Sequence, residues 1–182
     1  MTKHFLRMPY MALAVLVLFF TSCETDNPIS LPDTLSFNIE KSTTLDLQAA
    51  PALGRITLSD VKMQIDLDSA LAANGANNFT VSNVQAKSVV LETITPETNL
   101  DAFDTLSIFV TSKTLPEAKV AYKEGIANNI TSLPMDVNTV NVAEYLKEKP
   151  ANFKIQAYIG DSIKKPMTMK VNMVFKVDVK KK

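Results

Sequence analysis

Apolar and polar residues alternate along much of this chain, most clearly near its C-terminus. In Met167–Val179 every second residue is apolar, and a single valine interrupts the polar side. Successive side chains of a β-strand point to opposite faces, so this period predicts a strand with one buried and one solvated face. The pattern recurs in Phe153–Ile159, in Val61–Leu67 and in Thr105–Thr111, where Phe109 occupies a polar position. Such runs are typical of antiparallel sheets.

Four further runs are shorter or less regular but also predict strands. They are Leu35–Ile39, Val84–Ile94, Lys119–Lys123 and Leu133–Val137. Turn residues separate the runs at fairly regular spacing. We therefore expect one all-β domain over residues 34–182: an antiparallel two-sheet, immunoglobulin-like sandwich with one or two short helical turns. A closed barrel is the alternative. A transmembrane barrel is excluded, because it needs many strands of about 9–11 residues and several runs here are shorter.

Two segments predict short helical turns. Ser69–Asn74 is followed by Gly75, which suits a left-handed C-terminal stop. Val142–Glu148 is preceded by Asn141, and Glu144 follows three residues later, which predicts an N-cap within a variant of the capping box.

A short apolar run near the N-terminus ends just before the only cysteine, Cys23. Two basic residues precede the run and two small residues, the second being Ser22, follow it. This order predicts a secretory signal peptide over residues 1–22, cleaved between Ser22 and Cys23. The run is shorter than the about 18 residues that a membrane-spanning helix requires. An ordinary signal cleaved elsewhere, which would leave Cys23 as a free thiol, is the alternative.

The stretch ending at Cys23 resembles the lipobox of bacterial lipoproteins. The resemblance implies lipidation of the thiol and acylation of the new amine, and hence an outer-membrane anchor facing the periplasm or the cell surface. Residues 23–33 contain two prolines and several acids, which predicts an extended tether. The acids after the cysteine resemble the surface-export signal of Bacteroidota lipoproteins.

Composition excludes several kinds of chemistry. The only histidine, His4, lies within the predicted signal, and Cys23 would carry lipid. The mature chain would then lack the Ser-His-Asp and Cys-His nucleophiles and the usual zinc and copper ligands. Four unclustered glycines form no phosphate-binding loop. The 19 basic and 19 acidic residues give no overall field that would attract nucleic acid. We expect no cofactor, no metal and no nucleic-acid partner.

Two close pairs of acids are the candidates for carboxylate chemistry: Asp66 with Asp68, and Asp101 with Asp104. Neither matches a calcium loop, and the first pair is expected on the solvated face of a strand end. A glycosidase that uses two carboxylates needs no histidine and stays open, although the sequence identifies no pair for it.

The basic run 180–182 is expected to continue the solvated face of the last strand as a solubilising tail or a charged edge. Contact with anionic lipid head groups is the alternative, and it usually takes about 4–8 bases.

A three-residue pattern of Asp, hydroxyl residue and apolar residue resembles the O-glycosylation motif of exported Bacteroidota proteins. It implies modification at one or more of Thr34, Ser69 and Ser162. Thr105 also matches, but it falls inside a predicted strand.

Three segments together resemble uncharacterised Bacteroidota lipoproteins: Cys23–Asp26, Asn83–Ser112 and Val142–Val179. In the last of them, a helical turn with the sequence Val-Ala-Glu-Tyr-Leu-Lys precedes two long alternating strands. The resemblance implies an outer-membrane-tethered β-sandwich and supplies no functional residues. We expect a non-enzymatic structural or binding module that meets an envelope protein or glycan; a tethered, carboxylate-only hydrolase is the alternative.

Overall fold

The computed structural model describes residues 32–49 and 53–182, so the predicted signal peptide, Cys23 and most of the predicted tether lie outside the described residues. In the described part no helix is long and apolar enough to cross a membrane. The elements are β1 (Thr34–Leu47), β2 (Gly54–Met63), α1 (Leu67–Ala73), β3 (Phe79–Thr93), β4 (Phe103–Thr111), β5 (Ala118–Glu124), β6 (Ser132–Pro134), β7 (Asp136–Val137), the 3₁₀ turn η1 (Tyr145–Lys147), β8 (Ala151–Ile159) and β9 (Met167–Lys181).

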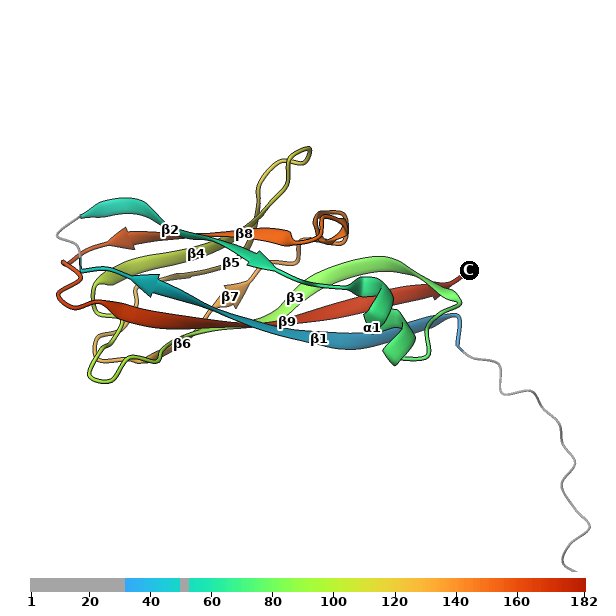
Figure 1. Cartoon of the computed structure of the whole chain (residues 1–182), viewed down its shortest axis with the longest axis horizontal. Coiled ribbons are helices and arrows are strands. Elements are labelled where there is room, and N and C mark those ends of the chain that lie inside the picture. The colour runs from blue at the N-terminus through green and yellow to red at the C-terminus, as the bar shows by residue number, and fades with distance from the viewer. Residues whose placement is uncertain (1–31, 50–52) are drawn as a thin grey trace, which may run out of the picture. The chain divides into compact units, whose positions relative to one another are not determined.

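The strands form two antiparallel sheets (Figure 1). One has the order β1-β9-β3-β6 and the other the order β2-β8-β4-β5-β7. The prediction of an all-β domain with two antiparallel sheets is confirmed. The apolar positions of the alternating runs face one another between the sheets and form one continuous core.

The two longest alternating runs supply the centre of this core. Every second residue of β9 from Met167 to Val179 is buried, as the sequence predicts. Phe175 of β9 meets Phe153 of β8 across the core, with 6.0 Å between ring centroids and an angle of 43° between the ring planes. Both side chains are 0% exposed, so this tilted aromatic pair joins the two sheets.

The predicted strand Leu133–Val137 is two strands, because the chain crosses between the sheets at Met135. β6 pairs with β3 in the first sheet, and β7 pairs with β5 in the second. The backbone N–H of Met135 donates to the Val89 carbonyl at 2.9 Å. The crossing therefore joins the two sheets along this side of the sandwich.

The predicted strand Val61–Leu67 ends earlier than the alternation suggests. β2 stops at Met63, and Asp66 caps the N-terminus of α1 by accepting a bond from the Asp68 backbone N–H at 3.2 Å. The expectation that these two acids lie on a strand end is therefore wrong, although both are exposed. An acid at the N-cap favours the start of a helix over continuation of the strand, because its carboxylate accepts a bond from a helical N–H that would otherwise be unpaired.

The C-terminus of α1 agrees with the prediction. Gly75 has φ +66°, and its N–H donates to the Ala72 carbonyl at 3.1 Å. The Ala76 N–H donates to the Leu71 carbonyl at 2.8 Å. These two bonds form a Schellman motif, in which glycine supplies the left-handed residue.

The predicted capping box at Asn141 is wrong. Asn141 does accept a bond from the Ala143 N–H, but Glu144 pairs with Lys147 rather than with the backbone of Asn141. The Asn141 Oδ1 atom also accepts the Val84 N–H at 3.0 Å. This amide therefore fastens the loop to β3, and only a 3₁₀ turn follows it.

The last strand is not an edge. β9 lies between β1 and β3, so the lysines at 180–182 do not protect a sheet edge as expected. The Lys181 N–H donates to the Asp33 carbonyl at 2.9 Å, so β9 ends where the described chain begins. We call this the N-terminal pole; it also carries α1 and η1. We call the other end of β9, with the β3–β4 and β8–β9 loops, the distal pole.

Candidate functional site

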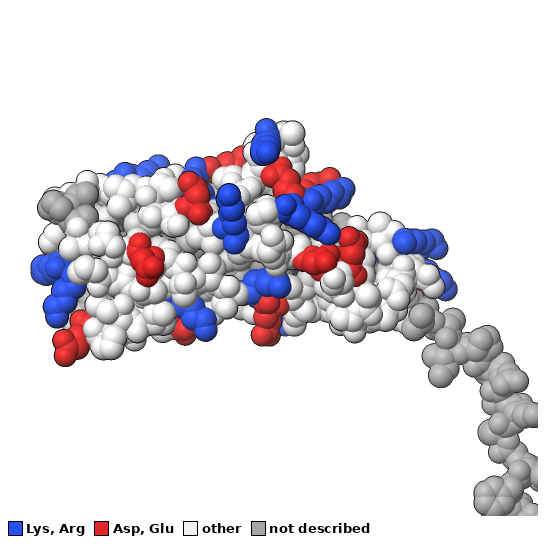
Figure 2. Space-filling view, in the orientation of Figure 1, with Lys and Arg blue, Asp and Glu red and all other residues white. Residues whose placement is uncertain are grey.

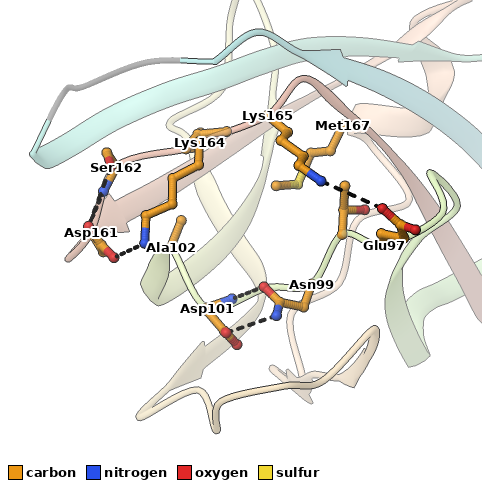
Figure 3. A pocket seen from close by; sticks show the side chains of 11 residues that line it. Glu97, Asn99, Asp101, Ala102, Asp161, Ser162, Lys164, Lys165 and Met167 are labelled. Atoms are coloured by element: carbon orange, nitrogen blue, oxygen red, sulfur yellow. Dashed lines mark hydrogen bonds and ion pairs between the residues drawn. The ribbon is translucent and has the colours of Figure 1, made fainter.

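A hollow of about 260 Å³ lies at the distal pole between the β3–β4 and β8–β9 loops (Figure 3). Four of the charged side chains that line it form two ion pairs: Asp161 with Lys164 at 3.2 Å, and Glu97 with Lys165 at 3.6 Å. The backbone N–H of Ser162 and the Lys164 ammonium lower the pKa of Asp161. The Glu97–Lys165 pair joins the two loops, whereas the Asp161–Lys164 pair lies within the β8–β9 loop. Both pairs leave few charges for a ligand.

The predicted pair Asp101 and Asp104 lies near this pole, and both carboxylates contact neighbouring loop residues. Asp101 accepts bonds from the Asn99 side chain at 2.8 Å and from the Asn129 N–H at 2.5 Å. The Asp104 carboxylate occupies the space where a Cβ atom would stand at position 160, which explains the glycine there. Both acids therefore have structural contacts.

The other predicted pair lies at the opposite pole. Lys149 bonds Asp66 at 3.1 Å and Asp68 at 3.2 Å. The Ser69 hydroxyl and then the Lys149 ammonium lower the pKa of Asp66 to about 2. The 15 residues of β9 separate the two poles, a length of about 50 Å at the usual rise per residue. The two acid pairs therefore do not converge. No group of three or more potential metal-ligating side chains occurs within residues 32–49 and 53–182.

A second hollow, of about 430 Å³, lies at the N-terminal pole between α1, β3 and η1. Leu71, Phe79 and Leu146 line it, and the charged pairs of Lys147 and Lys149 stand at its rim. Nothing in the described residues indicates what would cover this apolar groove.

The third hollow, of about 160 Å³, lies on the outer face of the five-stranded sheet. The residues around this hollow form rows that run across the sheet. Each row crosses β2, β8, β4 and β5 in that order. We call these outward-facing residues the aromatic face. Its rows are Arg55-Tyr158-Thr105-Glu124, Thr57-Gln156-Ser107-Tyr122 and Asp60-Lys154-Phe109-Lys119.

Two lysines stand over the aromatic rings of this face. The Lys119 ammonium lies 5.7 Å from the Phe109 centroid and 5.5 Å from that of Tyr122. The Lys154 ammonium lies 5.5 Å from the Phe109 centroid and also pairs with Glu117. Cation–π contacts of this kind hold the long lysine side chains in place.

An irregularity in β5 produces this arrangement. The register of β4 with β5 shifts between Ile108 and Phe109, and the consecutive residues Val120 and Ala121 are both buried. Such a bulge reorients the side chains next to it, here bringing Lys119 opposite Phe109. In the sequence, the only trace of the site is Phe109 at a polar position of its run.

The two outer faces of the sandwich differ. The outward positions of β1, β9 and β3 within residues 34–47, 79–93 and 167–181 carry no aromatic side chain. In the view of Figure 2, basic and acidic side chains are interspersed with uncharged surface and do not form a patch of one sign. The aromatic face is therefore the candidate functional site, a set of residues that sequence reasoning missed.

The residues predicted for modification lie in different surroundings. Ser22 and Cys23 lie outside the described residues. Thr34 is exposed at the start of β1, and Ser69 is exposed on α1 with its hydroxyl donating to Asp66 at 2.7 Å. Ser162 is half-buried at the distal pole, and Thr105 is half-buried within the aromatic face. Glycosylation at Thr34, Ser69 or Ser162 stays a prediction.

Comparison with known proteins finds similarity among solved structures alone. No protein-family model and no curated protein matches the chain. Among solved structures, a decameric BFDV capsid protein is similar with a TM-score of 0.39 and 10% sequence identity. The alignment covers 81% of this chain and 99% of the capsid chain. A similarity of this size carries no argument about function.

Proposed function

We propose that this chain is an envelope lipoprotein, anchored in the outer membrane through lipid on Cys23, with an immunoglobulin-like sandwich that acts as a non-enzymatic binding module. The observation that carries the binding role is the aromatic face, where outward-facing aromatic, cationic and hydrogen-bonding side chains stand together on four paired strands. Side chains on paired strands are held more precisely than those on loops, which suits recognition.

The aromatic face does not lie at the end of the sandwich where the predicted tether begins. The eleven residues 24–34 connect Cys23 to the first residue of β1, Thr34. Fully extended, they reach at most about 40 Å. The tether would join the sandwich at its N-terminal pole, whereas the aromatic face lies along the side of the five-stranded sheet.

The contacts and pKa values of the candidate carboxylates favour a binding role over hydrolysis. A glycosidase needs two carboxyl groups close together, one with a raised pKa. Here Asp66 and Asp68 both bond to Lys149, and the pKa of Asp66 is lowered rather than raised. Asp101 bonds to the loops of the distal pole, and Asp104 packs against Gly160.

Replacement of the cysteine tests the anchor. Cys23→Ser should move the protein from the membrane fraction to the soluble fraction and abolish incorporation of labelled palmitate. Ser30→Ala, which changes the predicted tether but keeps the cysteine, is the matched control and should stay in the membrane. An unchanged distribution of Cys23→Ser would contradict the proposal.

Photo-crosslinking on intact cells tests the binding role. A photoreactive phenylalanine analogue at position 122 should give adducts of higher mass, whereas the same analogue at position 174, on the outer face of the other sheet, should not. Equal yields at the two positions would mean that the aromatic face has no particular role.

A further inference from the structure

We propose that the aromatic face binds an acidic glycan chain, one whose sugars carry carboxylate or sulfate groups. The proposal rests on the binding role proposed above and names the class of ligand.

Tyr158 supplies an aromatic surface that a sugar could cover. It is 48% exposed, although it lies on β8, between β2 and β4. A pyranose ring has an apolar C–H side that packs against aromatic rings, whose large, rigid surface costs little conformational entropy on binding. Lysines stand over the rings of Phe109 and Tyr122, so Tyr158 is the aromatic side chain best placed for stacking.

Hydrogen-bonding groups surround Tyr158 at fixed register. Thr105 and Arg55 lie beside it in the same row, and Gln156 and Ser107 lie in the next. Together they offer hydroxyl, amide and guanidinium groups that can donate to and accept from sugar hydroxyls. All four, like Tyr158, line the hollow of about 160 Å³.

The charged residues that line the hollow favour an anionic ligand, although Asp60 adds a second acid to the third row of the aromatic face. Arg55 and Lys119 line it with a single acid, Glu124. Lys154 is neutralised by Glu117, whereas neither Arg55 nor Lys119 has an acidic partner within 4.0 Å among the described residues. A guanidinium group donates two parallel hydrogen bonds to a carboxylate, so Arg55 is suited to the acidic group of the glycan.

The small apolar area of this face favours a glycan over a protein. Stable protein interfaces bury about 800 Å² on each partner around an apolar core. The strongly exposed large hydrophobic residues of the described chain are Leu53, Ile94 and Tyr158, and of these only Tyr158 lies on the aromatic face. Single aromatic side chains separated by polar ones match the alternation of apolar and hydroxyl surfaces along a sugar chain.

Binding of defined polysaccharides to the detergent-solubilised full chain tests the proposal. The acidic probes are polygalacturonate, alginate, hyaluronan and chondroitin sulfate, and dextran is the neutral probe. We expect at least one acidic probe to bind with an affinity that falls as salt is raised, and dextran to bind at least tenfold more weakly. Failure of all four acidic probes to bind, or equal binding of dextran, would overturn the proposal.

Variants locate the binding. Arg55→Ala and Tyr158→Ala should each weaken binding of the acidic probe at least tenfold, and Arg55→Lys should recover only part of the loss. Lys170→Ala and Val174→Ala, on the outer face of the other sheet, are the matched controls and should bind like the unaltered chain. Equal effects of the two sets would overturn the assignment to this face.

The intact-cell crosslinks separate this inference from the proposed function. If position 122 captures only protein and no polysaccharide, the acidic-glycan proposal is wrong, while the module still has a binding role. If position 122 captures nothing beyond the yield at position 174, both proposals fail.

Discussion

Asp178 joins three strands on the outer face of the four-stranded sheet, and its replacement should make stability depend less on pH. Its carboxylate accepts bonds from Ser36 of β1 at 2.6 Å and Asn83 of β3 at 3.1 Å, and it pairs with Lys176 of β9 at 2.9 Å. The Ser36 hydroxyl, then Lys176 and then Asn83, lower the pKa of Asp178 from 3.8 to about 2.

The size of this effect follows from linkage between protonation and folding. A decrease of nearly two pKa units is worth about 2 kcal/mol at 1.36 kcal/mol per unit. Because the Asp178 side chain is 27% exposed, solvent screening reduces the expected contribution to about 1–2 kcal/mol. The folded pKa lies below the unfolded one, so this contribution is fully present above about pH 5 and is lost as the pH falls towards 2.

Asp178→Asn removes the charge and keeps the size of the side chain. We expect it to lower the free energy of unfolding by about 1–2 kcal/mol at pH 7, by roughly half as much at pH 3, and by a few tenths at pH 2. Urea denaturation followed by circular dichroism measures these values. Glu40→Gln, which removes a negative charge from β1 on the same face, is the control and should show a much smaller pH dependence. A loss for Asp178→Asn that is the same at pH 7 and pH 3 would refute the linkage argument.

Two further substitutions test the core and the helix stop. Phe175→Ala opens a cavity beside Phe153 and should cost about 3–5 kcal/mol in urea denaturation, whereas Phe109→Ala on the outer face should cost much less; similar losses would contradict the assigned faces. Gly75→Ala should cost about 1 kcal/mol, because φ is +66° and an added Cβ meets nothing within 4 Å, so the cost is backbone strain alone. Gly75→Asn, which tolerates this conformation better, should cost less in the same assay, and equal losses would contradict that reason.

Local pattern was enough to predict most of the strands. The period-two runs at Phe153–Ile159 and Met167–Val179 fall within β8 and β9. The pattern works because burial on one side of a strand selects apolar residues at alternate positions. It failed at two places where a side-chain hydrogen bond decides the backbone. Asp66 starts a helix through a local bond where alternation continues, and Asn141 bonds to β3, far away in the chain, instead of completing a capping box.

The sequence by itself determined that the chain forms antiparallel strands with one apolar face, and that a chain cleaved before Cys23 would contain no histidine. Only the tertiary structure decided which strands are neighbours. Arg55, Phe109, Lys119 and Tyr158 come from four different strands, and they stand on one face because of the register of β2, β8, β4 and β5 and the bulge in β5. Register depends on contacts between residues far apart in the chain, so no local pattern contains it.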